Sequence, residues 1–228
     1  MSWPATTFKC NRCDFSQCDA VAWGTKEYLL PNGLRLPAPS QLGWCHDCKD
    51  LAPIESISAE DRLVDIQKIE KDLAECPAPR TPRWWHLGRY FFYKGTLAFE
   101  EREKRHYDLL IVALADARDL LELHQQRLTP PRCMECGSAN VTAPIITNRA
   151  RWEDRSQPKA TGFQHPNCGG DILMIDDDLR IGLAPSVQRF TPEGEFIEKV
   201  HLDGYSSPRD EFFEEREQSN TLIRRQMK

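Results

Sequence analysis

Apolar residues recur at helical spacing in two stretches of the chain. In residues 56–76 they fall three and four positions apart, and Ser58 with Asp61 forms a capping-box pattern typical of a helix N-terminus. In residues 97–128 a longer apolar stripe continues at the same spacing and ends before Pro130. We therefore predict two helices in the middle of the chain, the second of them long.

Short apolar runs separated by turn residues lie on both sides of these helices. Near the N-terminus, the Asn-Gly pair that follows Pro31 separates two such runs, which is a β-hairpin signal because both residues tolerate positive φ. Further runs follow in residues 132–203, where the acidic stretch 176–178 and the Pro-Glu-Gly stretch 192–194 read as turns between strands. Both ends of the chain therefore carry β character.

These patterns predict an α+β protein in four parts. The parts are an N-terminal β module (1–54), a helical segment (55–130), a second β module with a β extension (131–203) and a short C-terminal helix (204–228). With 228 residues, the chain is long enough to bury a core without disulfides.

Charge and composition narrow the function classes. The formal net charge is -5, which argues against a protein held on nucleic acid mainly by the phosphate field. No 18-residue apolar run is present, so we expect no membrane span. The first residues lack the pattern of a secretory signal, and nine cysteines is an odd number, so we expect a reduced, cytoplasmic protein rather than a disulfide scaffold.

Most of the cysteines fall in closely spaced pairs. Three Cys-x-x-Cys pairs and one His-x-x-Cys pair are present, and such a pair forms a tight turn, or knuckle, that places two ligand atoms on one metal ion. The spacing along the chain predicts two sites of two knuckles each. The expected ligands are Cys10, Cys13, Cys45 and Cys48 in the first site, and Cys133, Cys136, His165 and Cys168 in the second.

Each set resembles a zinc ribbon, the rubredoxin-like knuckle module, over residues 7–51 and 131–185. The resemblance implies two structural Zn²⁺ ions per chain, but no activity. No sequence pattern indicates an organic cofactor. Three alternatives stay open. Iron can occupy a four-thiolate site, Cys18 can replace a ligand, and a surface His165 would leave a water on the metal and permit catalysis.

No catalytic motif accompanies these knuckles, so an enzyme is the less favoured reading. The residues 80–95 are basic and aromatic, and the loop around Trp152 is similar, which predicts a contact surface or, more plainly, a packed linker. Our first hypothesis is a non-catalytic protein-interaction module, namely an adaptor, regulator or inhibitor such as a bacterial immunity protein. A nucleic-acid-binding protein is the alternative. The candidate contact residues are Arg83, Trp84, Trp85, Arg89, Arg149, Arg151, Trp152 and Arg155.

Overall fold

The computed structural model describes residues 2–19, 24–76, 94–145, 157–182, 186–201 and 208–227. These residues form three helices and eleven strands in three sheets, which confirms the α+β class. The chain divides into two compact units: residues 58–127 form a helical unit, and the segments on either side of it together form a β-rich unit. None of the described helices has the length and apolar character that a bilayer-spanning helix needs.

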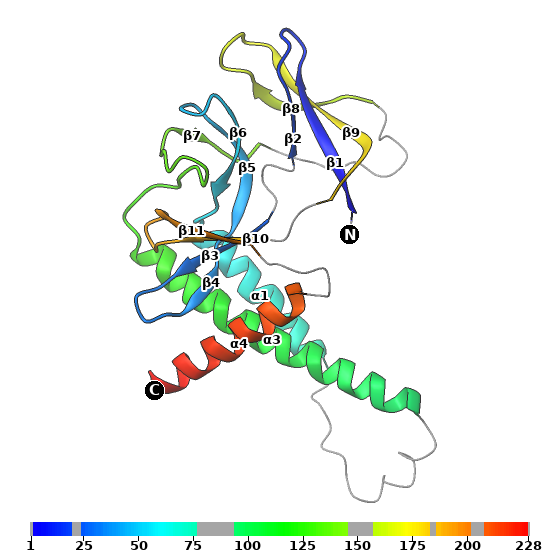
Figure 1. Cartoon of the computed structure of the whole chain (residues 1–228), viewed down its shortest axis with the longest axis vertical. Coiled ribbons are helices and arrows are strands. Elements are labelled where there is room, and N and C mark those ends of the chain that lie inside the picture. The colour runs from blue at the N-terminus through cyan, green and yellow to red at the C-terminus, as the bar shows by residue number, and fades with distance from the viewer. Residues whose placement is uncertain are drawn as a thin grey trace, which may run out of the picture. The chain divides into compact units, whose positions relative to one another are not determined.

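The first sheet of the β-rich unit joins the two ends of the sequence. Its strand order is β2-β1-β9-β8, and strand β1 pairs antiparallel with β9 so that Cys10 lies opposite Ile172. Figure 1 shows β1 in blue beside β9 in yellow. The pairing brings the start of the chain against a segment more than 150 positions later. The bounds are β1 (Ser2–Cys10), β2 (Ser16–Cys18), β8 (Lys159–Gln164) and β9 (Asp171–Gly182).

A second sheet of three strands packs in the same unit. Its order is β6-β5-β7, with bounds β5 (Ser40–Cys45), β6 (Asp50–Glu55) and β7 (Val141–Thr142). The middle strand needs glycine at position 43, because a Cβ there would lie 2.5 Å from Ile54 Cγ1 and 2.7 Å from the Thr142 carbonyl oxygen. Strand β7 has only two residues, and β6 was not predicted from the sequence.

The third sheet has the order β11-β10-β3-β4. Its bounds are β3 (Thr25–Leu29), β4 (Arg35–Pro37), β10 (Ser186–Phe190) and β11 (Phe196–His201). The predicted hairpin between β3 and β4 is confirmed, with Gly33 at φ 85°. Helix α4 (Pro208–Gln226) closes one edge of the sheet, since the Asn220 side chain accepts from the Arg35 N–H at 3.0 Å and donates to the Arg35 carbonyl at 2.6 Å.

The hydrophobic core of the β-rich unit is built from the first two sheets. Phe8, Ile172 and Met174 come from the first sheet, and Leu42, Trp44 and Leu51 come from the second. Burial of these side chains supplies most of the free energy that holds the two sheets together. A smaller cluster around Ile54 and Ala52 continues this core on the other face of the second sheet.

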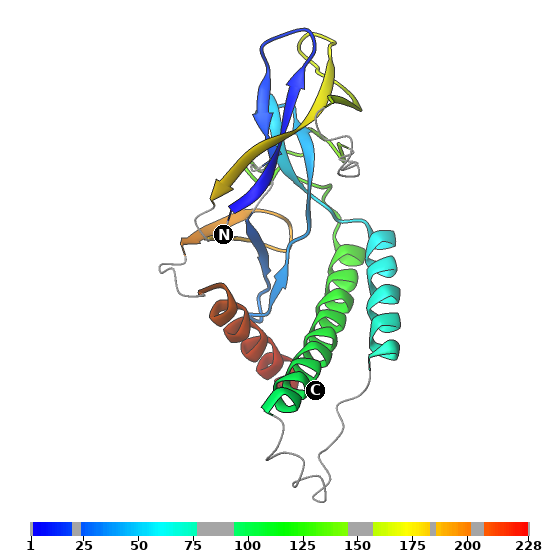
Figure 2. The ribbon, with the colours of Figure 1, turned by 90° about the vertical axis from the view of Figure 1, so that its right-hand side faces the viewer.

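The helical unit is an antiparallel pair formed by α1 (Ala59–Glu75) and α3 (Lys94–Gln126). The predicted cap of α1 is confirmed, because Ser58 Oγ accepts from the Asp61 N–H at 3.1 Å. The two helices lie side by side in both views (Figures 1 and 2). Ile66 of α1 and Ala117 and Leu120 of α3 are buried, whereas the other apolar side chains described in residues 59–75 and 104–126 are partly or fully exposed.

The acidic stretch 176–178 does not form the predicted turn. It lies inside the continuous strand β9, where the register against β1 shifts: Pro4 pairs with Arg180, and Thr6 pairs with Asp176. Strand β9 has more residues than β1 between these two pairs, and the difference forms a bulge in β9. The strand continues through the bulge because it pairs with β1 before and after it. By contrast, the turn predicted at 192–194 is confirmed, with Gly194 at φ 82°.

Candidate metal centres

One knuckle from each end of the chain forms the first cluster, which we call site 1. Cys10 is the last residue of strand β1 and Cys13 follows it, and His165 and Cys168 lie in the turn between β8 and β9. The ligand atoms of these four residues all lie within 4.8 Å of one another. Because β1 and β9 are paired, the end of one strand and the start of the other place the two knuckles face to face.

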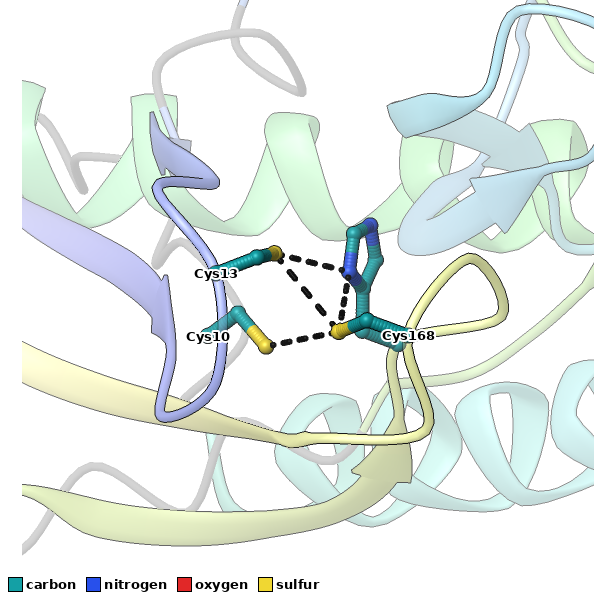
Figure 3. Close-up of side chains that lie close together, drawn as sticks. Cys10, Cys13 and Cys168 are labelled. Atoms are coloured by element: carbon teal, nitrogen blue, oxygen red, sulfur yellow. Dashed lines mark hydrogen bonds between the residues drawn. The ribbon is translucent and has the colours of Figure 1, made fainter.

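The distances within site 1 suit a tetrahedral metal ion. The Cys168 sulfur lies 3.4 Å from that of Cys10 and 3.6 Å from that of Cys13, and the three thiols point toward one another (Figure 3). His165 Nδ1 lies 3.3 Å from the Cys13 sulfur and 3.2 Å from the Cys168 sulfur. A zinc ion about 2.3 Å from each sulfur would hold two sulfurs about 3.8 Å apart, so little movement is needed.

His165 is buried against aromatic rings and is not a surface residue. It is 4% exposed, its ring stacks on Phe15 at a centroid distance of 4.9 Å, and Trp44 meets it edge to face at 5.1 Å. Its Nε2 atom is buried and has no hydrogen-bond partner among the described residues. The premise that His165 is a surface residue is therefore wrong.

A close backbone approach positions the site 1 knuckles. A Cβ at Gly170 would lie 2.6 Å from the Cys10 sulfur and 2.7 Å from Arg12 Cβ, so only glycine fits there. Across the same contact, Arg12 Nη1 donates to the Cys168 carbonyl at 2.9 Å, and the Asp171 N–H donates to Asn11 Oδ1 at 2.9 Å. These bonds hold the two knuckles together without any metal.

The second cluster, site 2, contains only cysteines. Cys45 is the last residue of β5, Cys48 lies in the turn between β5 and β6, and Cys133 and Cys136 lie before β7. The sulfurs of Cys45 and Cys136 are 3.5 Å apart, and those of Cys48 and Cys133 are 4.0 Å apart. The Cys48 N–H also points at the Cys45 sulfur at 3.4 Å, which is the knuckle geometry that stabilises a thiolate.

Backbone pairing beside site 2 joins the chain segments that lead into and out of the helical unit, and we call this pairing the neck. Ile54 forms a β-bridge with Cys133, and the Met134 N–H donates to the Pro53 carbonyl at 2.8 Å. The Glu55 N–H donates to the Arg132 carbonyl at 3.0 Å, and the Arg132 N–H donates to Glu55 Oε2 at 2.9 Å. Site 2 is thus built onto a neck that already brings the two segments together.

Polar side chains add a second connection at site 2. Asp47, between the two cysteines of the first knuckle, accepts from Ser138 Oγ at 2.6 Å and from Asn140 Nδ2 at 3.2 Å. The Ser138 and Asn140 bonds lower the pKa of Asp47. Ser138 also accepts from the Cys133 N–H through its carbonyl at 2.8 Å, so Asp47 positions the loop that shapes the second knuckle.

The structure pairs the four predicted knuckles in a different way from the pairing that we expected from the sequence. All eight predicted ligand residues fall in the two clusters, but Cys10 and Cys13 pair with His165 and Cys168, while Cys45 and Cys48 pair with Cys133 and Cys136. The expectation of two local sets is therefore corrected. Strand pairing is the reason: β1 pairs with β9, and β5 pairs with β7 at Cys45 and Val141.

Strand β5 contributes one residue to the surroundings of site 1 and one ligand residue to site 2. Neighbouring residues of a strand point to opposite faces of a sheet, so Trp44 and Cys45 at the end of β5 point in opposite directions. Trp44 packs on His165 of site 1, whereas Cys45 belongs to site 2. The spacing of cysteines alone does not identify Trp44 or Phe15 as part of a site, although their size and position beside knuckles are a signal.

Metal binding at site 2 requires two of its thiols to release protons. Burial raises the pKa of the Cys133 thiol to about 12, and burial together with the neighbouring thiols raises the pKa of Cys48 far above its ordinary value. Without a metal, these thiols keep their protons at neutral pH. A bound divalent cation displaces the protons and removes the repulsion between thiolates, so metal binding and proton release are coupled.

The donor sets fit zinc. Three thiolates with one imidazole, and four thiolates, are both common sets for structural Zn²⁺, and both groups could hold a metal ion. Cys18 belongs to neither cluster: its thiol donates to Asp19 Oδ1 at 3.6 Å. Cys76 is the C-cap of α1. The eight candidate contact residues at 83–89 and 149–155 lie outside the described residues.

The chain matches no known protein-family model, no curated protein and no solved structure.

Proposed function

We propose that the protein is a non-catalytic zinc-binding protein that recognises another protein, as an adaptor, regulator or inhibitor does. The observation that carries this proposal is that each cluster offers four side-chain ligands, with a buried imidazole as the fourth in site 1. Four protein ligands complete a tetrahedral zinc ion and leave no position for a substrate. The metals then serve to hold the fold together.

The helical unit is the part that favours a protein partner. Leu63 and Val64 on α1 and Leu109 and Ile111 on α3 are between 44% and 63% exposed. Acidic residues outnumber basic ones in both helices, which opposes contact with a phosphate backbone. Exposed apolar side chains on an acidic helical surface are typical of protein recognition.

The test is affinity purification of the full-length tagged chain from its native host after cross-linking. Three forms are compared: the wild type, Val64→Glu and Gln67→Glu. Both substitutions place a new carboxylate on an exposed position of α1, but only the first replaces an apolar side chain. We expect a protein partner that is retained by the Gln67→Glu variant and lost with the Val64→Glu variant. Equal capture by all three forms would argue against α1 as the contact.

Nucleic acid is the alternative partner, because the segments 80–95 and 149–155 are basic and aromatic in sequence. Binding of the same three forms to short DNA and RNA duplexes and single strands is measured as a function of salt concentration. Affinity that falls steeply with salt and is lost on Arg83→Ala and Arg149→Ala would replace the protein-partner proposal. We expect no binding near physiological salt.

A further inference from the structure

The ligands of the two sites differ in their exposure to solvent. Site 2 has one exposed cysteine in each knuckle, Cys48 in the first and Cys136 in the second, whereas Cys45 and Cys133 are buried. No ligand of site 1 is exposed. A small polar reagent can therefore reach sulfur in site 2 without any opening of the fold, and susceptibility of a cysteine to oxidation follows its thiolate character and exposure.

A buried thiol lies next to the exposed Cys136. The Cys45 sulfur is 3.5 Å from it, on the opposite knuckle, while the other cross-knuckle pair, Cys48 and Cys133, is separated by 4.0 Å. A disulfide bond is about 2.05 Å long, so the first pair needs the smaller movement to form one.

We propose that site 2 is an oxidation site: a hydroperoxide converts Cys45 and Cys136 into a disulfide and releases the site 2 metal, while site 1 keeps its metal. This inference rests on the metal-binding part of the proposed function and is independent of the kind of partner that the protein recognises. It assigns to the exposed knuckle a chemical reaction with a small oxidant, in addition to the structural role of the site.

The reaction proceeds in two steps that balance. The Cys136 thiolate attacks one peroxide oxygen, the O–O bond breaks, and hydroxide leaves and takes up a proton to form water. The product is a sulfenic acid. The Cys45 thiolate then attacks the Cys136 sulfur, the S–O bond breaks, and the second hydroxide takes up a proton and leaves as water. The two sulfurs lose two electrons in total, which reduce the peroxide, and the metal loses two of its four ligands.

The neck limits the structural consequence of this reaction. The disulfide would join the same two knuckles that the metal joins, and the β-bridge from Ile54 to Cys133 with the bond from Met134 to Pro53 does not involve the oxidised sulfurs. We therefore expect the oxidised chain to lose one metal and keep its fold.

The experiment uses the full-length wild-type chain loaded with zinc and titrated with hydrogen peroxide. A chromogenic chelator measures the released zinc, circular dichroism follows the fold, and mass spectrometry of unreduced peptides maps the disulfides. We expect release of about one of two zinc ions per chain, because only one of the two structural sites opens. The release should coincide with a Cys45–Cys136 disulfide and an unchanged far-UV spectrum.

Several results would overturn the proposal. For the metal, these results are release of both ions together, release of the site 1 ion first, or release only when the chain unfolds. For the cysteines, they are oxidation of Cys10, Cys13 or Cys168 before the site 2 cysteines, or a disulfide within a single knuckle. A Cys18→Ser/Cys76→Ser variant is the matched control, because neither residue is a ligand in the clusters. It should release zinc as fast as the wild type, and slower release would assign the reaction to a non-ligand thiol instead.

Discussion

Site 1 and site 2 use the same knuckle chemistry in different surroundings. Site 1 lies at the rim of the main core, where its histidine is enclosed by Phe15 and Trp44 and where Cys10 is itself a core residue. Site 2 lies beside a smaller cluster, with Cys48 and Cys136 open to solvent. In site 1, two ligands are buried and the other two are half-buried. In site 2, the neck and the bonds of Asp47 hold the knuckles in place.

The difference shows how a metal site can be secured in two ways. A site enclosed by apolar rings excludes water and competing ligands, so its metal should exchange slowly. A site held by backbone pairing and exposed polar bonds keeps its geometry while its sulfurs stay accessible.

The largest effect should come from removing both metals. Apparent binding energies of structural zinc are about 10–16 kcal/mol per ion, and each ion here joins segments far apart in sequence. Prolonged chelation should therefore unfold the β-rich unit and release about two ions per chain, measured by thermal melting and metal analysis. The helical unit contains none of the clustered ligands, so part of the helical circular dichroism should survive. An unchanged melting temperature after full metal removal would contradict the structural role.

Zinc stoichiometry of double variants tests the pairing of the knuckles. Cys10→Ser/Cys168→Ser removes two ligands of site 1, and we expect about one zinc ion to remain per chain. Cys10→Ser/Cys45→Ser removes one ligand from each site and should weaken both. If the knuckles paired locally along the sequence, the two outcomes would be exchanged: Cys10→Ser/Cys168→Ser would remove one ligand from each site, and Cys10→Ser/Cys45→Ser would remove two ligands from one site and leave about one zinc ion per chain.

His165→Ala should remove the site 1 metal while leaving that of site 2. The substitution deletes a ligand and leaves a cavity between Phe15 and Trp44, so the loss of stability should reach at least about 2 kcal/mol in chemical denaturation. His46→Ala is the matched control, because His46 lies in the site 2 knuckle but contacts Thr142 Oγ1 rather than the ligands. It should retain both ions and cost about 1 kcal/mol or less.

Gly170→Ala should affect site 1 through packing alone. The new methyl group would overlap the Cys10 sulfur and Arg12, and overpacking of this kind costs about 1–3 kcal/mol. We expect weaker zinc binding at site 1, measured by competition with a chelator. Gly162→Ala serves as the control: its φ of 75° makes alanine strained, but no atom lies within 4 Å of the added Cβ, so stability should fall without a change in zinc affinity.

The smallest effect should come from Asp47→Ala. The variant loses the bonds to Ser138 and Asn140 that position the second knuckle of site 2, and outer contacts of this kind change metal affinity by about tenfold. The rate of zinc transfer from site 2 to a chelator should rise accordingly. Asp14→Ala, which removes an exposed carboxylate near site 1, should leave both rates unchanged. Equal effects of the two variants would contradict the role assigned to Asp47.

Local sequence signals were enough to predict the helices, the hairpin at Asn32 and the ligand residues. Each of these features forms through interactions between residues that are close in the sequence. A cap such as Ser58, a glycine at positive φ and a Cys-x-x-Cys knuckle all act within a few residues. The pairing of knuckles depends instead on which strands meet, and no local pattern encodes the contact of β1 with β9. The turn predicted at 176–178 was wrong for the same reason, because pairing with the distant strand β1 makes this acidic stretch part of β9.

The crossed pairing of the knuckles has a consequence for the order of events during synthesis. Chains emerge from the ribosome N-terminus first, so Cys10, Cys13, Cys45 and Cys48 are available long before any of their partners. A metal ion captured at that stage meets the local four-cysteine set that the finished fold does not use. Site 2 can assemble once Cys136 has emerged, and site 1 only after Cys168. Maturation of this chain therefore either delays metal capture or includes an exchange of thiolates between ions.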